Sequence, residues 1–375
     1  MSHSTPREMI SADGRLEKKV PDDELARVRF RELWTSNVGS SIEQLWYLGG
    51  DLYLTTKGTR TSHRLIKVSG SSGKIEWAFD LTGRPEFRPT VYEYPEELAR
   101  ERELWLVQND RLHCLDDAYG LELYNIDTKV SVSTPCEVGP ERVFIGTWDH
   151  RVYGFGKASR IHEWTYLTDA PVVAAPTLAK LMVYAGSEDG QLYAFNEGAG
   201  YQEGESWVHR TGGKIVNSPC CYRDRIYVGS WDYKLYCLEE FRGLTRWAYP
   251  SGAPVVSGVF PFKDSVFATI RDDRNPQAMT TSVIALNADT GDLQWERKGL
   301  DQVLAADAIH CLVLDGDRKL HGVRHTDGQT DWQLDVSRYA FVLGQDARQG
   351  AERERWGRLV LATRDGIIQS IQPKR

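Results

Sequence analysis

The sequence has no apolar run of the roughly 18 residues that a membrane-spanning helix needs, although 41% of its 375 residues are hydrophobic. It also lacks a P-loop, a Cys/His spacing typical of zinc sites and the Gly-x-Ser-x-Gly turn of serine hydrolases. The nine histidines are dispersed along the chain. These absences predict a protein without membrane insertion, without enzyme activity, and without a bound cofactor or metal.

The chain also lacks an excess of positive charge, because 53 Asp and Glu residues outnumber 46 Lys and Arg residues and give a formal net charge of −7. Non-specific affinity for nucleic acid comes from Lys and Arg side chains that neutralise phosphates, so nucleic acid is not an expected partner. The first 28 residues are polar and lack the apolar core and cleavage site of a secretory signal. We therefore expect a flexible arm over residues 1–28 and a cytoplasmic location. A leader removed before residue 1 would leave the same sequence, so an exported location stays open.

What the sequence does contain is a repeat. Each unit has four runs of alternating apolar and polar residues, such as IVNSPCCY, RIYVGSW, KLYCLEE and LTRWAYP in the fifth unit. Runs of this kind, separated by Gly, Asp and Asn, predict short antiparallel strands. An aromatic residue closes each unit at intervals of 37 to 48 residues, which fits a four-stranded propeller blade: Trp34, Trp77, Tyr124, Trp164, Trp207, Trp247, Trp295 and Trp332.

The two ends of the chain fit a closed ring. The last unit reaches Arg375 after only three runs, whereas RFRELWTS at 29–36 carries Trp34 and precedes the first run of the first unit. We predict that this N-terminal strand completes the eighth blade, because closure removes exposed sheet edges. The expected fold is an all-β, eight-bladed propeller of four-stranded antiparallel blades. It forms one domain over residues 29–375, and we expect the protein to be a monomer. Seven blades are the alternative if the second unit, with Tyr124 instead of Trp, is irregular.

Units such as SSGKIEW, NADTGDLQW and SPCCYRDRIYVGSWDYKLYCL resemble the pyrroloquinoline-quinone-type repeat, in which a Thr-Gly or Ser-Gly turn leads into a tryptophan strand. The resemblance covers nearly the whole chain from Arg29. That family includes quinone-dependent dehydrogenases, a periplasmic propeller that assists outer-membrane protein assembly, and cytosolic propeller domains with no known chemistry. The resemblance implies that the tryptophans dock neighbouring blades, namely Trp34, Trp77, Trp164, Trp207, Trp247, Trp295 and Trp332.

The dehydrogenases that resemble this fold hold quinone and calcium in the central funnel, often beside a disulfide between adjacent cysteines. Cys220 and Cys221 are adjacent here, but strand alternation predicts that their side chains point to opposite faces. The chain also lacks the inserts that build the dehydrogenase site. A quinone-dependent, calcium-assisted dehydrogenase or a small-ligand propeller is therefore the alternative hypothesis. Its candidate calcium ligands are scattered over different blades: Glu43, Glu86, Asn217, Asp301 and Asp307.

Two other cysteines indicate packing. Cys114 in LHCL and Cys237 in LYCL stand where other units carry Ala194 in LYAF and Gly154 in VYGF. Because free cysteine behaves as a small hydrophobic residue, we expect a small, buried side chain at this position, with no metal or redox role.

Departures from the repeat indicate where a partner could bind. In a propeller, the B–C turns and the D–A connections between blades share one face, and the A–B and C–D turns share the other. Two charged insertions, at 93–103 and 346–358, belong to the A–B face as solvated loops or partner contacts. Longer connections at 57–63 and 271–281 belong to the B–C face.

The B–C turns GTWDHR and GSWDYK place tryptophan where most units have a polar residue or glycine. Trp and Arg dominate the energetics of many interfaces. We therefore predict a non-catalytic scaffold, or a recognition or regulatory subunit of a larger complex, that binds a protein or peptide at this rim. The alternative is that each indole packs on a neighbouring blade. The predicted partner-binding residues are Trp148, Trp231, Tyr233, His150, Arg84 and Lys214.

Overall fold

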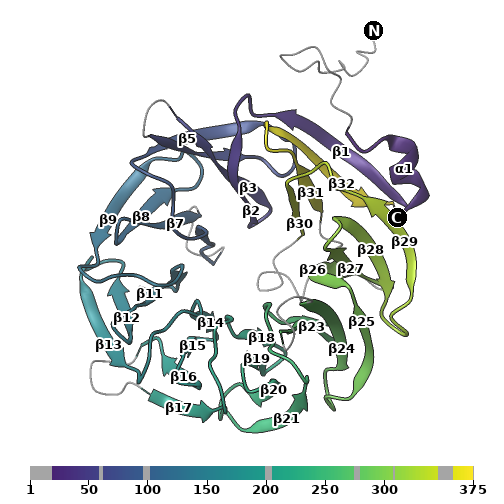
Figure 1. Cartoon of the computed structure of the whole chain (residues 1–375). Coiled ribbons are helices and arrows are strands. Elements are labelled where there is room, and N and C mark those ends of the chain that lie inside the picture. Colours follow the sequence, from purple (N-terminus) through teal and green to yellow (C-terminus); the bar gives the residue numbers. More distant parts are fainter. Residues whose placement is uncertain are drawn as a thin grey trace.

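A computed structural model of the chain describes residues 19–58, 62–95, 102–198, 205–273, 279–306, 309–344 and 358–374. Eight four-stranded antiparallel sheets surround a central axis (Figure 1). The prediction of an eight-bladed all-β propeller is confirmed, and the seven-bladed alternative is wrong. Within the described residues, no helix is long and apolar enough to cross a membrane.

Each blade runs from an innermost strand A to an outermost strand D, and the first four blades follow one another along the chain. Their strands are β2 (Ile42–Leu48), β3 (Asp51–Lys57), β4 (His63–Val68) and β5 (Ile75–Leu81); β6 (Thr90–Tyr92), β7 (Glu103–Gln108), β8 (Arg111–Asp116) and β9 (Glu122–Asp127); β10 (Glu137–Val138), β11 (Arg142–Gly146), β12 (Arg151–Gly156) and β13 (His162–Leu167); and β14 (Thr177–Ala179), β15 (Met182–Gly186), β16 (Gln191–Asn196) and β17 (Glu205–Arg210).

The remaining four blades repeat this order, except that the last blade takes its outer strand from the N-terminal end. Their strands are β18 (Cys220–Tyr222), β19 (Arg225–Ser230), β20 (Lys234–Glu239) and β21 (Thr245–Pro250); β22 (Phe260–Phe262), β23 (Ser265–Asp272), β24 (Thr280–Asn287) and β25 (Leu293–Lys298); β26 (Leu300–Ala306), β27 (His310–Asp315), β28 (Lys319–Arg324) and β29 (Thr330–Asp335); and β30 (Phe341–Leu343), β31 (Leu359–Ala362), β32 (Ile367–Pro373) and β1 (Phe30–Asn37).

The ring closes as the two chain ends predicted. Strand β1 pairs antiparallel with β32, from Phe30 opposite Pro373 to Asn37 opposite Ile367. The Lys374 N–H also donates a hydrogen bond of 2.6 Å to the Arg29 carbonyl. Blade 8 therefore joins both ends of the described chain in one sheet. Without β1, this blade would have three strands and the outer edge of β32 would be unpaired.

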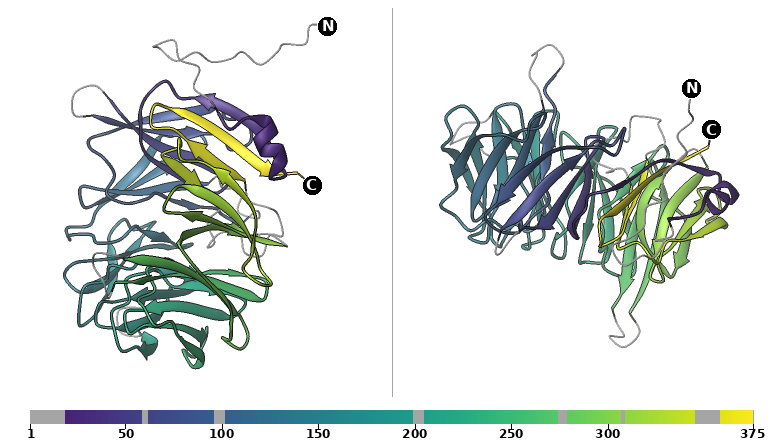
Figure 2. Two further views of the ribbon diagram at one scale, coloured as in Figure 1. Left: turned by 45° about the vertical axis from the view of Figure 1, so that its right-hand side comes forward. Right: turned by 90° about the horizontal axis from the view of Figure 1, so that it is seen from above.

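The expectation of a flexible arm over residues 1–28 is wrong for its described part. Helix α1 (Asp22–Arg27) lies on the outer edge of the ring beside β1 and β32 (Figure 2). Val20 and Leu25 are fully buried, and the Val20 N–H donates to the Tyr339 hydroxyl at 2.8 Å. The apolar pattern of Val20, Leu25 and Val28 explains this packing, because burying those side chains offsets the entropy of ordering the segment. Residues 1–18 lie outside the described residues.

Five strand-D tryptophans dock on the C–D turn of the next blade. The indole of Trp247, for example, covers Gly291, whose φ is 76° and whose Cβ, if present, would lie 2.6 Å from the ring. Trp247 Nε1 also donates to the Ala288 carbonyl at 3.0 Å. Glycine is required at this contact because it combines a positive φ with close approach of the indole. The same glycine contact recurs at Trp34, Trp77, Trp207 and Trp295.

Two junctions replace this contact. Tyr124 of blade 2 faces Arg160, whose guanidinium lies 4.4 Å from the tyrosine ring centre. Trp332 of blade 7 packs edge-on against Phe30, with 5.4 Å between the ring centres. Both belong to the cluster that includes the buried side chains of the N-terminal segment. The N-terminal segment thus takes the place of a C–D turn at the closure of the ring.

The strand-C residue opposite each docking aromatic is small in seven blades, as the cysteines predicted. Cys114 pairs with Tyr124, and Cys237 pairs with Trp247. Both cysteines are completely buried. In blade 1 the same position, opposite Trp77, holds Lys67, and this departure produces a buried charged network.

Candidate functional site

The B–C turns of blades 3, 4 and 5 share a Ser/Thr-x-Asp motif. Its hydroxyl residue is fully buried, and in blade 5 the Ser230 hydroxyl donates to the Gly213 carbonyl of the adjoining D–A connection at 3.0 Å. The carboxylate accepts a hydrogen bond from a tyrosine four residues later, which ties the turn to strand C. These pairs are Asp149 with Tyr153 at 3.0 Å, Asp189 with Tyr193 at 2.8 Å and Asp232 with Tyr236 at 2.6 Å.

The middle residue of the motif points outward from this fixed frame. Trp148 is 55% exposed and Trp231 is 47% exposed. Their backbone N–H groups donate to the carbonyls of Ser131 at 3.2 Å and Lys214 at 2.9 Å. Each indole therefore keeps about half of its surface accessible, and the other half is covered. The backbone is held on both sides while the indole stays accessible, which is the arrangement of a preformed contact residue.

The other predicted residues lie on the same face. Tyr233 is 48% exposed with a φ of 65°, and His150 is also exposed with a φ of 64°. Lys214 Nζ forms an ion pair with Glu188 at 2.7 Å, and Arg84 is exposed in the connection from β5 to β6.

The backbone hydrogen bond from Trp231 to Lys214 brings these two residues together at blade 5, and Tyr233 lies two residues after Trp231 in the same turn. The structure does not bring all six predicted residues together. Trp148 and His150 lie on blade 3, with blade 4 between them and that group, and Arg84 lies on the junction of blades 1 and 2 (Figure 1).

Hydrogen bonds stabilise the charged form of the carboxylate in the blade 3 turn. Partial burial raises the pKa of Asp149, but hydrogen bonds from Thr147, Tyr153 and Arg151 outweigh it and leave the pKa below its usual range. The carboxylate therefore stays ionised and remains an acceptor into mildly acidic solution.

A cavity of about 560 Å³ lies on the propeller axis among the inner strands. Its lining includes Arg88, Asn217, Gln302 and Cys220, but none of the described lining residues is a carboxylate. Calcium prefers several carboxylate and amide oxygens. Across the described ranges, no three His, Cys, Asp or Glu residues are grouped so that they could hold a metal ion.

The scattered candidate ligands have other partners or positions. Glu43 pairs with His63 at 3.2 Å, and the Asn217 amide donates to the Val255 carbonyl at 2.8 Å. Asp301 accepts a hydrogen bond from Thr281, and Glu86 is exposed. Asp307 lies outside the described residues. The structure thus does not bring the described members of this set together.

The adjacent cysteines carry free thiols. Cys220 packs in the core between blades 5 and 6, whereas Cys221 packs against the core between blades 4 and 5. Their side chains lie on opposite faces of the sheet, as alternation predicts. Burial raises the pKa of the Cys221 thiol well above its usual value, which disfavours the reactive thiolate.

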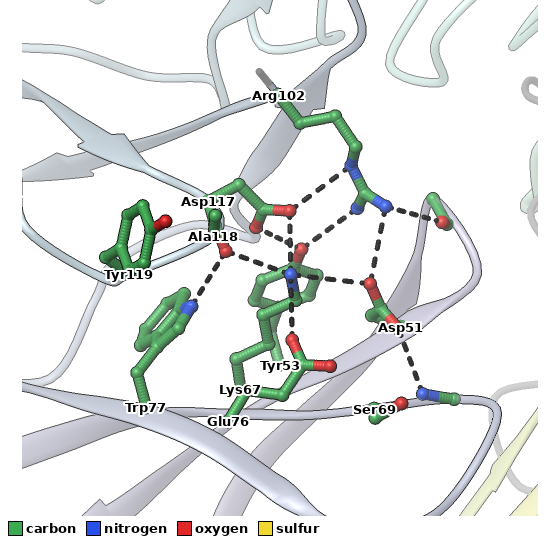
Figure 3. A network of polar contacts seen from close by, with 12 residues as sticks. Asp51, Tyr53, Lys67, Ser69, Glu76, Trp77, Arg102, Asp117, Ala118 and Tyr119 are labelled. Atoms are coloured by element: carbon green, nitrogen blue, oxygen red, sulfur yellow. Dashed lines mark hydrogen bonds and ion pairs between the residues drawn. The ribbon is translucent and has the colours of Figure 1, made fainter.

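Sequence reasoning missed a buried charged network between blades 1 and 2 (Figure 3). Lys67 Nζ lies 2.8 Å from Asp117 Oδ2, 3.1 Å from Glu76 Oε2 and 3.5 Å from Asp51 Oδ2. Arg102 Nε lies 3.2 Å from Asp117 Oδ2. Aligning the repeats could have revealed it, because Lys67 occupies a position that is small in every other blade.

Asp117 is the centre of this network. Its carboxylate accepts hydrogen bonds from the Tyr53 hydroxyl at 2.5 Å and from Lys67, and its carbonyl accepts one from Trp77 Nε1 at 2.8 Å. Burial and then the charge of Asp117 raise the pKa of Tyr53, so its hydroxyl remains a donor. The network holds Arg102, one end of the A–B connection of blade 2.

The other side of that connection is held by a second buried ion pair. Lys157 Nζ of blade 3 lies 2.8 Å from Glu103 and 4.1 Å from the ring centre of Tyr92. Tyr94 donates a hydrogen bond to Glu103 at 2.6 Å. The base of the predicted insertion at 93–103 is therefore anchored to blades on both sides. Parts of the insertions and long connections, at 59–61, 96–101, 274–278 and 346–357, lie outside the described residues.

Comparison with known proteins agrees with this fold. A family model described as outer membrane protein assembly factor BamB matches residues 108–218 and 204–355. No curated protein matches the sequence. The resemblance to a pyrroloquinoline-quinone-type repeat propeller is thereby confirmed.

Two solved structures have a similar fold. The crystal structure of BamB from Moraxella catarrhalis is 18% identical, with a TM-score of 0.67 over 92% of this chain and 97% of that one. The computationally designed protein Ika8 is 12% identical, with a TM-score of 0.65 over 90% of this chain and 98% of its own. At such identities the likeness shows the fold alone.

Proposed function

This chain belongs to the family whose model is described as outer membrane protein assembly factor BamB, and from that premise we propose that it is a non-catalytic scaffold that binds a protein or peptide. The binding surface is the B–C face of blades 3 to 5. A recognition or regulatory subunit of a larger complex would use the same surface.

One observation carries this proposal: three large aromatic side chains are about half exposed on turns whose backbones are fixed. Trp148, Trp231 and Tyr233 are 55%, 47% and 48% exposed. An exposed indole loses little entropy on binding when its backbone is already held, so it can contribute strongly to an interface. The motif that holds these turns therefore serves to present side chains.

The lining of the axial cavity supports a non-catalytic role. A quinone and calcium site would need oxygen ligands that converge on the axis. The described lining offers Arg88 and amide or hydroxyl groups, without a carboxylate. Reconstitution with calcium and pyrroloquinoline quinone followed by a dye-reduction assay tests this part, and quinone-dependent dye reduction would overturn it.

We also propose a cytoplasmic location and a monomeric state for the isolated protein. Six free thiols, five of them buried, suit a reducing compartment. The family description refers to the outer membrane, so fractionation of the native host is the direct test, and recovery outside the cytoplasm would reject this location. Light scattering during size-exclusion chromatography tests the oligomeric state.

The binding proposal is tested by affinity capture from the native host with mass spectrometry. We expect a stoichiometric protein partner with the wild-type chain and loss of that partner with Trp148→Ala/Trp231→Ala. Phe241→Ala is the matched control, because Phe241 is a 62% exposed aromatic residue on the opposite, C–D face. Capture that survives the double substitution, or fails equally with Phe241→Ala, would contradict the proposal.

A further inference from the structure

A second cleft opens on the B–C face, between blades 7 and 8. Its volume is about 950 Å³. Three arginines, two aspartates and hydroxyl-bearing residues from both blades line it: Arg318, Asp335, Ser337, Arg338, Tyr339, Thr363, Arg364 and Asp365. Three guanidinium groups in one cleft are notable because the whole chain carries a net charge of −7.

Arg318 has guanidinium nitrogens without a hydrogen-bond partner in the described part of the chain. Its Nε and Nη2 atoms are buried and have no hydrogen-bond partner among the described residues. Its backbone is fixed, since its N–H donates to the Asp315 carbonyl at 3.1 Å and its carbonyl accepts from the Val336 N–H at 3.1 Å. A buried donor without an acceptor is costly, so a small shift of this side chain toward an oxyanion in the cleft would form the hydrogen bonds that the protein leaves unmade.

The two aspartates offset part of this charge, and the three arginines of the lining exceed them by one. Asp335 Oδ1 already accepts the Ser337 N–H at 2.9 Å, and hydrogen bonds from Ser337 hold its pKa below the usual range. Arg338 is positioned by a hydrogen bond of 3.1 Å to the Lys19 carbonyl. Arg364 is exposed and occupies the middle of a Thr-x-Asp turn, the position that Trp148 and Trp231 hold in blades 3 and 5.

We propose that this cleft binds a phosphoryl group carried by a segment of the protein partner. Guanidinium groups form paired hydrogen bonds with phosphate oxygens. The volume of the cleft exceeds what one phosphate needs, which leaves room for the peptide that bears it. This inference rests on the proposed scaffold function and adds the chemistry of a second contact on the same face.

The experiment measures fluorescence anisotropy of a labelled peptide, Gly-Ser-Gly-phosphoSer-Gly-Ser-Gly, with the full chain. We expect saturable binding that weakens as salt is raised, and no binding of the same peptide without the phosphate. Arg318→Gln and Arg364→Gln should each weaken binding about tenfold, because each removes a charge-assisted contact. Arg242→Gln is the control, since it makes the same charge change at an exposed site on the opposite face.

Competition identifies the source of the phosphoryl group. Displacement of the peptide only by a large excess of inorganic phosphate supports a peptide-borne group, whereas equal affinity for inorganic phosphate would overturn that part of the proposal. Equal binding of a peptide with Glu at the phosphoserine position would also overturn it. If Arg318→Gln lowers the melting temperature, Arg364→Gln alone decides the result, because its side chain is exposed. No phosphopeptide binding, with partner capture retained, would reject this site and leave the scaffold function standing.

Discussion

Tryptophan serves two opposite purposes in this molecule, and blade 5 contains both. Trp247 is 8% exposed and fills the junction with blade 6, whereas Trp231 is 47% exposed on the B–C rim. The first is fixed by close contact with a glycine in the next blade, and the second by the backbone hydrogen bonds of its own turn. Residue type therefore does not distinguish a docking tryptophan from a contact tryptophan, but its strand or turn position does.

The junctions themselves differ in a similar way. Between blades 5 and 6, Trp247 lies opposite Cys237 in an apolar core. Between blades 1 and 2, Trp77 lies opposite Lys67, and a charged network surrounds the same indole contact. The contact of tryptophan with glycine tolerates either environment, provided that every buried charge has a partner.

The largest effect is expected for Trp247→Ala. Loss of the indole leaves a cavity at the junction and should lower the free energy of unfolding by about 3–5 kcal/mol. Urea denaturation followed by circular dichroism measures this change. A loss below 1 kcal/mol would show that blade docking does not depend on this residue.

Asp117→Ala should destabilise the charged junction by about 3 kcal/mol, because it leaves Lys67 and Arg102 without their shared carboxylate. The same substitution made in a Lys67→Ala background should cost clearly less, since one of the two cations is then absent. Urea denaturation of the four variants gives the coupling energy. Additive losses would contradict the network.

Gly291→Ala tests the close approach in the apolar junction. A methyl group there would meet the Trp247 ring at 2.6 Å and would also strain a positive φ, so we expect a loss of about 2–3 kcal/mol. Gly252→Ala is the matched control, because Gly252 has a φ of 71° but no atom within 4 Å of a Cβ. Gly252→Ala should lower the free energy of unfolding by about 1 kcal/mol. If the two variants lose the same free energy, the whole effect of Gly291→Ala comes from the backbone conformation.

Acid should weaken the blade 3 rim turn before it affects the docking contacts. The pKa of Asp149 is lower in the folded chain than its ordinary value, so its stabilising contribution is complete above the unfolded pKa of about 3.9 and is lost as the pH falls through the folded pKa. Asp149→Asn should therefore reduce the steepness of acid unfolding, measured as melting temperature between about pH 5 and pH 2. Asp169→Asn, at an exposed site in the next connection, should leave the acid profile unchanged.

The smallest effect on stability is expected for Trp231→Ala. Because the indole is about half exposed, its loss should change the free energy of unfolding by no more than about 0.5 kcal/mol. Differential scanning fluorimetry of this variant beside Trp247→Ala compares the two classes of tryptophan directly. A shift similar to that of Trp247→Ala would show that Trp231 is a packing residue.

The eight-bladed ring, its closure by β1 and the small residue opposite seven of the docking aromatics follow from the sequence alone. These features are local and periodic, so each unit carries its own record of strand alternation and of the turn before the tryptophan. The packed segment from Val20 to Val28 could not be found in this way, because it belongs to no repeat and is buried only by blades 7 and 8.

Which non-repeating side chains meet depends on how the blades pack in three dimensions. Lys67, Asp117 and Arg102 are far apart along the chain, and only closure of neighbouring blades brings them within hydrogen-bond distance. The arginine cleft arises in the same way, from Arg318, Arg338 and Arg364 on two blades and the connection between them. A repeat specifies the contacts that every unit makes, whereas contacts made once depend on how the ring sets one blade beside the next.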